Sequence, residues 1–267
     1  MSRPHPIRDA AIALTTLSAI PTPPEWLAGG QVQAAGWFPA VGGIIAAAGY
    51  GAVKLAESLH ILQRAPFAVA CAVILLWSLL TGGLHWRALT AVLASLLARL
   101  GSHGAGARLG VGLSVEGRTS VAPSPRVRTV AAAITALLAA GEAALIGSFL
   151  VMHQSPVLCI PLFARTAATA AAWFGKPVPA DNPARALFGR PSIVSAVAAS
   201  GAVGLATLAL WTGFAVRGLS IAAIGVAVGL VVPHVLSLAF EGVTLDVLEA
   251  SVVLAEILTF AAFAARL

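Results

Sequence analysis

The stretch LSIAAIGVAVGLVVPHVLSLAF, residues 219–240, contains no lysine, arginine, aspartate or glutamate. An apolar run of roughly 20 residues is the length at which an α-helix crosses a bilayer. Such runs recur along the 267-residue chain, of which 59% is hydrophobic and 10% charged. Soluble domains carry about 25% charged residues, so most of this protein's surface should face a solvent less polar than water. Alanine and leucine are abundant and no alternating polar pattern is present, which favours helices over a transmembrane barrel.

The sequence therefore predicts an all-α polytopic membrane bundle that forms one integral membrane domain over residues 1–267. Residues 10–20 are also apolar, but PTPP follows at once, which favours a retained amphipathic or half-inserted segment over a cleaved signal peptide. Stretches rich in proline and glycine separate the longer apolar runs. About seven transmembrane helices are predicted, at residues 36–56, 66–84, 129–152, 157–174, 193–216, 219–240 and 247–265.

The basic residues predict an orientation. With seven crossings, the segments 1–35, 85–128, 175–192 and 241–246 share one side and hold eleven Lys and Arg residues, against four on the other side. The positive-inside rule then makes residues 85–128 the main cytoplasmic loop of a multi-pass protein in a bacterial-type inner membrane. Within this loop, apolar residues at helical spacing predict a helix over 86–100. The arginines form no run and no aromatic residues interleave with them, so we expect no nucleic-acid partner.

Charged side chains inside the predicted spans stand where burial costs free energy. Glu142 and Arg165 lie at nearly equal distances from the turn near residue 154. At about 1.5 Å of rise per residue they reach the same depth, and we predict that they approach each other. A stabilising pair and a substrate-cavity role are both open. Glu249 and Glu256 are seven residues apart and share one helix face.

Four segments occur in an order that is informative: LSAIPTPPEW (17–26), GWFPAVGGIIAAAGYG (36–51), TGGLHW (81–86) and FEGVTLDVLEA (240–250). Together they resemble cobalamin synthase, the adenosylcobinamide-GDP ribazoletransferase family. That family joins α-ribazole or its phosphate to adenosylcobinamide-GDP, releases GMP and depends on Mg²⁺. The resemblance implies corrinoid and ribazole substrates, a lipid bilayer environment and Mg²⁺ as cofactor.

The signature loop of the family carries three aspartates after its Gly-Gly-x-His opening, on one side of a helix. The opening is present here as Gly82, Gly83 and His85, and the resemblance implies that both glycines bind substrate and that His85 is catalytic. The aspartate positions, however, are occupied by Arg87, Ala91 and Ala94. An arginine at position 87 could contact phosphate directly as a fixed cation, so Arg87 is a second candidate catalytic residue.

Further site residues follow from the same resemblance. SVEGRTS (114–120) best matches the family's Met-Arg-Asp-Ser-x-x-Gly, which makes Glu116 the candidate metal ligand and a catalytic residue, with Arg118 in substrate binding. Arg165 and Asp246 match an arginine and a late aspartate of the family and are also expected to bind substrate. Mg²⁺ prefers several hard oxygen ligands, so a single carboxylate makes a poor magnesium site.

Three functions therefore remain open. The first is a ribazoletransferase-like enzyme of cobalamin biosynthesis. The second, favoured by the missing aspartates, is a catalytically inactive paralogue that binds a corrinoid or a partner subunit. The third and least favoured is a transporter, because no inverted repeat with paired broken helices is apparent. Gly225 and Gly229 form a Gly-x-x-x-Gly helix-contact pattern, used either within the chain or between copies, so a homo-oligomer and cobalamin-pathway membrane partners also stay open.

Overall fold

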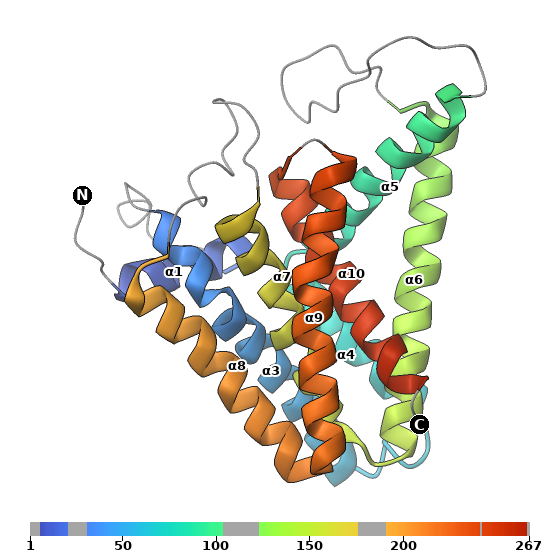
Figure 1. Cartoon of the computed structure of the whole chain (residues 1–267). Coiled ribbons are helices and arrows are strands. Elements are labelled where there is room, and N and C mark those ends of the chain that lie inside the picture. The colour runs from blue at the N-terminus through green and yellow to red at the C-terminus, as the bar shows by residue number, and fades with distance from the viewer. Residues whose placement is uncertain (1–5, 21–30, 104–122, 176–190, 241, 266–267) are drawn as a thin grey trace.

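The computed structural model describes residues 6–20, 31–103, 123–175, 191–240 and 242–265. The elements of this part are helices (Figure 1): α1 (Pro6–Leu17), η1 (Gln31–Trp37), α3 (Phe38–Ser58), α4 (Pro66–Leu80), α5 (Leu84–His103), α6 (Pro125–Val151), η2 (Ser155–Cys159), α7 (Ile160–Phe174), α8 (Ile193–Phe214), α9 (Val216–Ala239) and α10 (Leu245–Ala264). Among the described residues, six helices are long and apolar enough to cross a membrane, or seven if the bent pair α4–α5 counts as one span. The predicted all-α polytopic membrane bundle is confirmed.

Most predicted spans match a helix to within a few residues, and the differences lie where capping residues start a helix early. Ser124 accepts a hydrogen bond from the backbone N–H of Val127 and starts α6 at Pro125. Thr244 does the same for Val247 and starts α10 at Leu245. Such a side chain satisfies an N–H group that has no partner within the helix. Hydropathy does not reveal these polar positions, so the predicted starts at residues 129 and 247 were late.

The predicted span 66–84 is wrong at its C-terminal end. Helix α4 ends at Leu80, and α5 begins at Leu84 at an angle of 89° to it. Helix α4 has 15 residues, about 22 Å of length, whereas the hydrocarbon core is about 30 Å thick. A Schellman motif ends the helix: Gly83 N–H donates to the Ser78 carbonyl (2.7 Å) and Gly82 N–H to the Leu79 carbonyl (3.1 Å). The apolar run of the sequence continues through this turn, but the helix ends there because of the turn's backbone conformation.

The helix predicted over 86–100 is confirmed as α5, and it belongs to the bundle. Leu89 and Val92 are buried, and α5 packs against α6 and α10. The first part of the predicted 85–128 loop is therefore a packed helix of the bundle, and it forms the second half of a bent pair that is long and apolar enough to be one span. Together, α4 and α5 lead from the lower end of the bundle to the upper end, where α6 begins (Figure 1).

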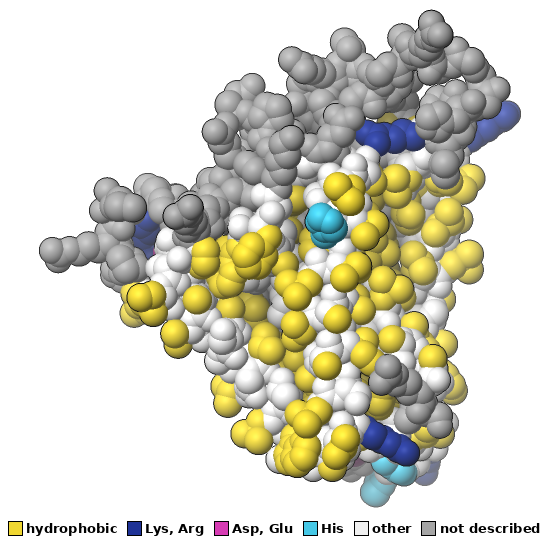
Figure 2. Space-filling model, viewed as in Figure 1, with side chains coloured by type: hydrophobic (Ala, Val, Ile, Leu, Met, Phe, Trp, Pro, Cys, Tyr) yellow, Lys and Arg dark blue, Asp and Glu magenta, His cyan; other side chains and the backbone are white. Residues whose placement is uncertain are grey.

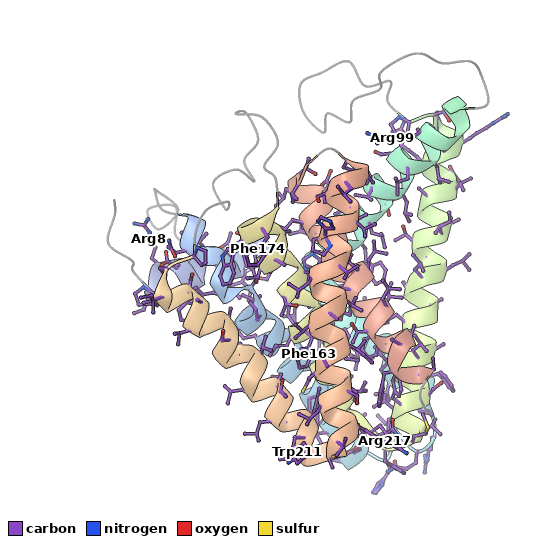
Figure 3. The ribbon with its side chains drawn as sticks, in the orientation of Figure 1. Arg8, Arg99, Phe163, Phe174, Trp211 and Arg217 are labelled. Atoms are coloured by element: carbon purple, nitrogen blue, oxygen red, sulfur yellow. The ribbon has the colours of Figure 1, made fainter. Side chains whose placement is uncertain are left out.

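The helix ends alternate between the two sides of the bundle in the way that the charge analysis assumed. Helices α3, α6, α8 and α10 begin at the upper end in Figure 1, and α5, α7 and α9 end there. Hydrophobic side chains cover the surface between the two ends on the visible face, and lysine or arginine side chains appear near both ends (Figure 2). Figure 3 shows Arg99 at the upper end and Arg217 at the lower end. The protein is a multi-pass membrane protein.

The predicted N-terminal segment is a helix, α1, of 12 residues. At about 1.5 Å per residue it is too short to cross a bilayer. Its Ile12 and Leu17 are buried, Ile7 is exposed, and the helix packs on η1 and α3. This agrees with an amphipathic segment that lies against the upper end of the bundle.

Helix α7 is the centre of the bundle. In the 18-residue apolar stretch that ends with α7, 78% is buried inside the bundle, against 22% in the corresponding stretch of α8. It packs on α3, α9 and α10, and small residues of these neighbours permit the close approach. A Cβ added at Gly225 of α9 would lie 2.8 Å from the Phe163 Cβ, and one at Gly229 would collide with the Thr166 hydroxyl. The Gly-x-x-x-Gly pattern thus serves a contact within the chain.

Candidate functional site

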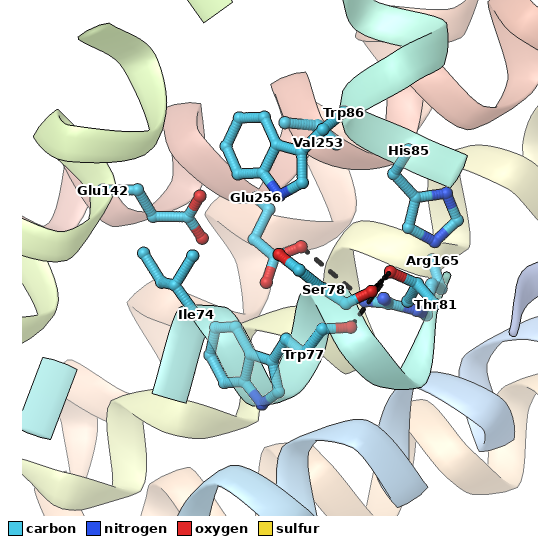
Figure 4. Close-up of a pocket in the computed structure, with 10 residues that line it drawn as sticks. All are labelled: Ile74, Trp77, Ser78, Thr81, His85, Trp86, Glu142, Arg165, Val253 and Glu256. Carbon is cyan, nitrogen blue, oxygen red and sulfur yellow. Dashed lines mark hydrogen bonds and ion pairs between the residues drawn. The ribbon is translucent and has the colours of Figure 1, made fainter. Parts of the chain in front are cut away.

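The bend between α4 and α5 opens onto a small buried pocket (Figure 4). Four charged or titratable side chains meet there from four helices, and we call them the buried charge cluster: His85 of α5, Glu142 of α6, Arg165 of α7 and Glu256 of α10. Each is at most 7% exposed. The last turns of α4 contribute Ser78 and Thr81 to the lining.

Arg165 has two polar contacts in the cluster. Its Nη1 lies 3.7 Å from Oε2 of Glu256 and donates a hydrogen bond of 2.8 Å to the Pro161 carbonyl. Helix α3 leaves room for this side chain at Gly42, where an added Cβ would lie 2.7 Å from the Arg165 Cδ. A charge so deep in a membrane protein is tolerated when it is paired inside the bundle.

Glu142 lines the same pocket and interacts electrostatically with both Arg165 and Glu256. Glu142 and Arg165 therefore line one pocket, as their equal depth predicts, but the ion-pair partner of Arg165 is Glu256, which lies between them (Figure 4). Equal depth in adjacent helices could be counted along the chain. The contact between α7 and α10, which brings Glu256 to Arg165, depends on how distant segments pack and could not be counted in this way.

His85 lies in the pocket with neither ring nitrogen hydrogen-bonded. The side chain is 3% exposed and lies beside Arg165 (Figure 4). Buried polar atoms in folded proteins nearly always have a partner, which is often an ordered water. The pocket itself holds no more than about one water-sized guest. The His85 ring therefore has room beside it for one small partner.

A second group of charges lies at the start of α10, and we call it the upper cluster: Arg87, Asp246 and Glu249. Glu249 is buried and interacts electrostatically with Asp246 and Arg87. The Arg87 side chain is exposed. Asp246 and Thr244 line a small hollow together with Ala91 of α5. Helices α5 and α10 therefore bring a cation, carboxylates and a hydroxyl near one another, with Arg87 exposed, Asp246 half-buried and Glu249 and Thr244 buried.

The structure divides the predicted site residues into groups. His85 and Arg165 meet in the buried charge cluster, and Arg87 and Asp246 in the upper cluster. Gly82 and Gly83 form the turn of the bent pair, at φ of 61° and 67°. The predictions for Glu116 and Arg118 concern residues outside the described ranges.

Glu249 and Glu256 were not among the site residues predicted from the sequence. Both lie in the apolar run of α10, and ionisable residues inside a span are functional candidates by default. That signal was available, because the two residues are seven positions apart on one helix face. The sequence does not show which neighbouring helix the two glutamates face.

The family resemblance implies Mg²⁺, an ion that needs several oxygen ligands close together. In the described ranges, no three His, Cys, Asp or Glu side chains are placed to hold a metal ion together. At the signature positions, Arg87 brings positive charge, Ala91 has no donor, and Ala94 is buried. Mg²⁺ requires octahedral oxygen coordination, usually with carboxylates. The described residues of the upper cluster do not fit a magnesium site.

Fold and site together define a polytopic helical membrane protein with a buried charge cluster and a second charged cluster near the upper end of the bundle. Residues 9–103 match the family model described as cobalamin-5-phosphate synthase. This range includes the TGGLHW turn and α5, so the resemblance inferred from the motifs is confirmed for this part of the chain. Comparison with curated proteins and with solved structures gives no match.

Proposed function

We propose that the protein acts in cobalamin biosynthesis as a ribazoletransferase of the cobalamin-synthase type. It would join α-ribazole or its phosphate to adenosylcobinamide-GDP and release GMP. The observation that carries this proposal is the family match over residues 9–103, which covers the bent pair and Arg87. The protein would lie in a bacterial-type inner membrane, with the upper end of the bundle in the cytoplasm, because the basic segments are concentrated there.

The upper cluster has the groups that this reaction needs, and one of them, Arg87, is exposed. A ribazole oxygen attacks the phosphorus that bears the cobinamide, and the bond from that phosphorus to the bridging oxygen breaks, so that GMP leaves. Arg87 is exposed and would bind the diphosphate, since a guanidinium matches phosphate geometry. The Asp246 carboxylate would accept the proton of the attacking hydroxyl. Glu249 interacts electrostatically with Arg87 and would keep the Arg87 guanidinium beside the substrate.

A second function is favoured by one specific observation. Positions 87, 91 and 94 carry Arg, Ala and Ala, and the described residues do not provide the magnesium ligands that the resemblance implies. A protein of this kind would keep the helical bundle and bind a corrinoid or a partner subunit without turnover.

Two measurements distinguish these functions. The first is growth of a strain that lacks cobalamin synthase, supplied with cobinamide under conditions that require cobalamin. The second is binding of adenosylcobinamide-GDP to the purified protein, followed by the absorbance of the corrinoid. Restored growth supports the transferase, and binding without restored growth supports the second function. If the strain does not grow and the protein does not bind adenosylcobinamide-GDP, both functions are contradicted.

A further inference from the structure

The buried charge cluster has more negative than positive charge. Glu142 and Glu256 bring two carboxylates, and Arg165 brings one guanidinium, all in a pocket away from solvent. Helix α4 ends beside this pocket, and the C-terminal end of a helix carries about half a negative charge. His85 does not supply the missing charge, because an imidazolium would lie beside the Arg165 guanidinium and repel it. A bound cation, or a proton on one of the carboxyls, would balance the cluster.

The pocket also offers oxygen atoms of the kind that bind an alkali cation. Besides the carboxylates, it is lined by the hydroxyls of Ser78 and Thr81. Thr81 Oγ1 donates to the Trp77 carbonyl (3.0 Å), so that its lone pairs remain able to accept or to bind a cation. In membrane transporters, broken helices with half-helix C-terminal ends form sodium sites in the same way. Here the carbonyls of the last turn of α4 already accept hydrogen bonds within the chain, so this helix end contributes its negative dipole and the Ser78 and Thr81 hydroxyls.

The unpaired His85 ring gives an independent indication of a guest. Both of its nitrogens are buried without a hydrogen-bond partner, and the ring lines the pocket. A single guest in the pocket, whether a cation or a water, would give an unprotonated imidazole nitrogen the partner that it lacks. The pocket is too small for a substrate fragment.

We propose that the buried charge cluster binds one sodium ion. The carboxylates of Glu142 and Glu256 and the hydroxyl of Ser78 hold the ion, and an unprotonated ring nitrogen of His85 faces it. A monovalent ion fits because Arg165 already neutralises one of the two carboxylates. The ion ties the bend of α4–α5 to α6 and α10 and so stabilises the bundle. This site does not depend on the proposed transferase activity.

Thermal unfolding of the full-length protein in detergent tests the site. Chloride concentration and pH are held constant while NaCl replaces choline chloride, with KCl in a parallel series. A ligand that binds only the folded state raises the melting temperature in proportion to the logarithm of its concentration above Kd. We expect Na⁺ at about 100 times Kd to raise Tm by about 5 °C or more, with a smaller effect of K⁺. Equal Tm in Na⁺ and choline would overturn the proposal.

Variants locate the effect. Glu142→Gln and Ser78→Ala should each reduce the sodium-dependent rise in Tm at least twofold. Glu249→Gln, a buried carboxyl on α10 outside the pocket, should keep the full rise. If Glu142→Gln does not fold, tryptophan emission of the unmodified protein replaces it, because Trp77 and Trp86 line the pocket and should respond to Na⁺. An unchanged sodium response in the two pocket variants, or a Tm that depends on acid but not on Na⁺, would contradict a sodium site.

Discussion

At the scale of single residues, Arg165 shows how this protein keeps charge inside an apolar bundle. The guanidinium is 2% exposed, is paired with Glu256 at 3.7 Å and donates to the Pro161 carbonyl. Burying an ion pair gains little net free energy, because both ions lose their hydration. Removing one partner is different, because it leaves the other charge buried and uncompensated.

Glu256→Leu should therefore destabilise the protein by about 3 kcal/mol or more. The double variant Glu256→Leu with Arg165→Leu should cost less than the sum of the two single variants, since it leaves no uncompensated guanidinium. Unfolding in detergent provides the free energies for this double-mutant cycle. Additive costs would show that the two side chains do not interact.

Gly42 offers a steric test of the same place. A Cβ at this position would lie 2.7 Å from the Arg165 Cδ and the same distance from backbone atoms of α7. Gly42→Ala should cost about 1–3 kcal/mol, the usual range for overpacking. Gly51→Ala is the matched control on the same helix, because no atom lies within 4 Å of its added Cβ. It should be neutral or slightly stabilising, and equal effects of both changes in a thermal unfolding assay would contradict the packing.

At the scale of elements, the α4–α5 pair is the feature that shapes the buried pocket. The break needs two successive residues with positive φ, and TGGLHW supplies Gly82 and Gly83. The 89° turn then directs His85 toward α7 and Arg87 toward the start of α10. One short turn thus serves both charged clusters.

Gly83→Ala should cost about 1–2 kcal/mol, the penalty of the left-handed conformation for a residue with a Cβ. Space is not the reason, since an added Cβ at Gly83 would meet no atom within 4 Å. Gly83→Asn should cost less, because asparagine tolerates this conformation. Melting temperatures of the two variants provide the check. An asparagine variant less stable than the alanine variant would indicate that steric contact, and not φ, sets the cost.

The helices of this protein are largely predictable from its sequence, whereas the pairing of its charges is predictable only in part. Apolar length and proline-glycine punctuation predicted the spans because each is a local property. The end of α4 was missed, because Leu84 continues the apolar run beyond the two glycines. The equal depth of Glu142 and Arg165 was predictable along one hairpin. Glu256 was not, because it comes from a segment about 90 residues further on in the chain, and only tertiary packing brings it there.

At the scale of the whole molecule, the path of α4 and α5 decides the number of crossings. If the pair crosses the membrane once, Gln63 before α4 and Ser124 before α6 lie on opposite sides. Both are exposed. In a background where Cys71 and Cys159 are replaced by alanine, Gln63→Cys should react with an impermeant maleimide in intact cells. Ser124→Cys should react only after lysis. Reaction of both cysteines from the same side would mean that the pair is re-entrant.

The upper cluster links this fold to the proposed chemistry, because Arg87 lies where the resemblance places the first aspartate of the family's signature. Arg87→Ala should lower any transfer rate by about 10²-fold, the effect of losing one preorganised charged contact to the reacting phosphate. Arg64→Ala, a change of an exposed arginine in the turn before α4, is the control and should leave the rate unchanged. Equal rates in both variants would remove Arg87 from the site.

The most direct measurement is GMP release by the purified, unmodified protein in detergent. Adenosylcobinamide-GDP and α-ribazole are supplied with and without Mg²⁺, and the corrinoid product is quantified beside the nucleotide. The account predicts that GMP and the joined corrinoid form in equal amounts. Absence of both, from protein that is folded and binds adenosylcobinamide-GDP, would contradict the transferase.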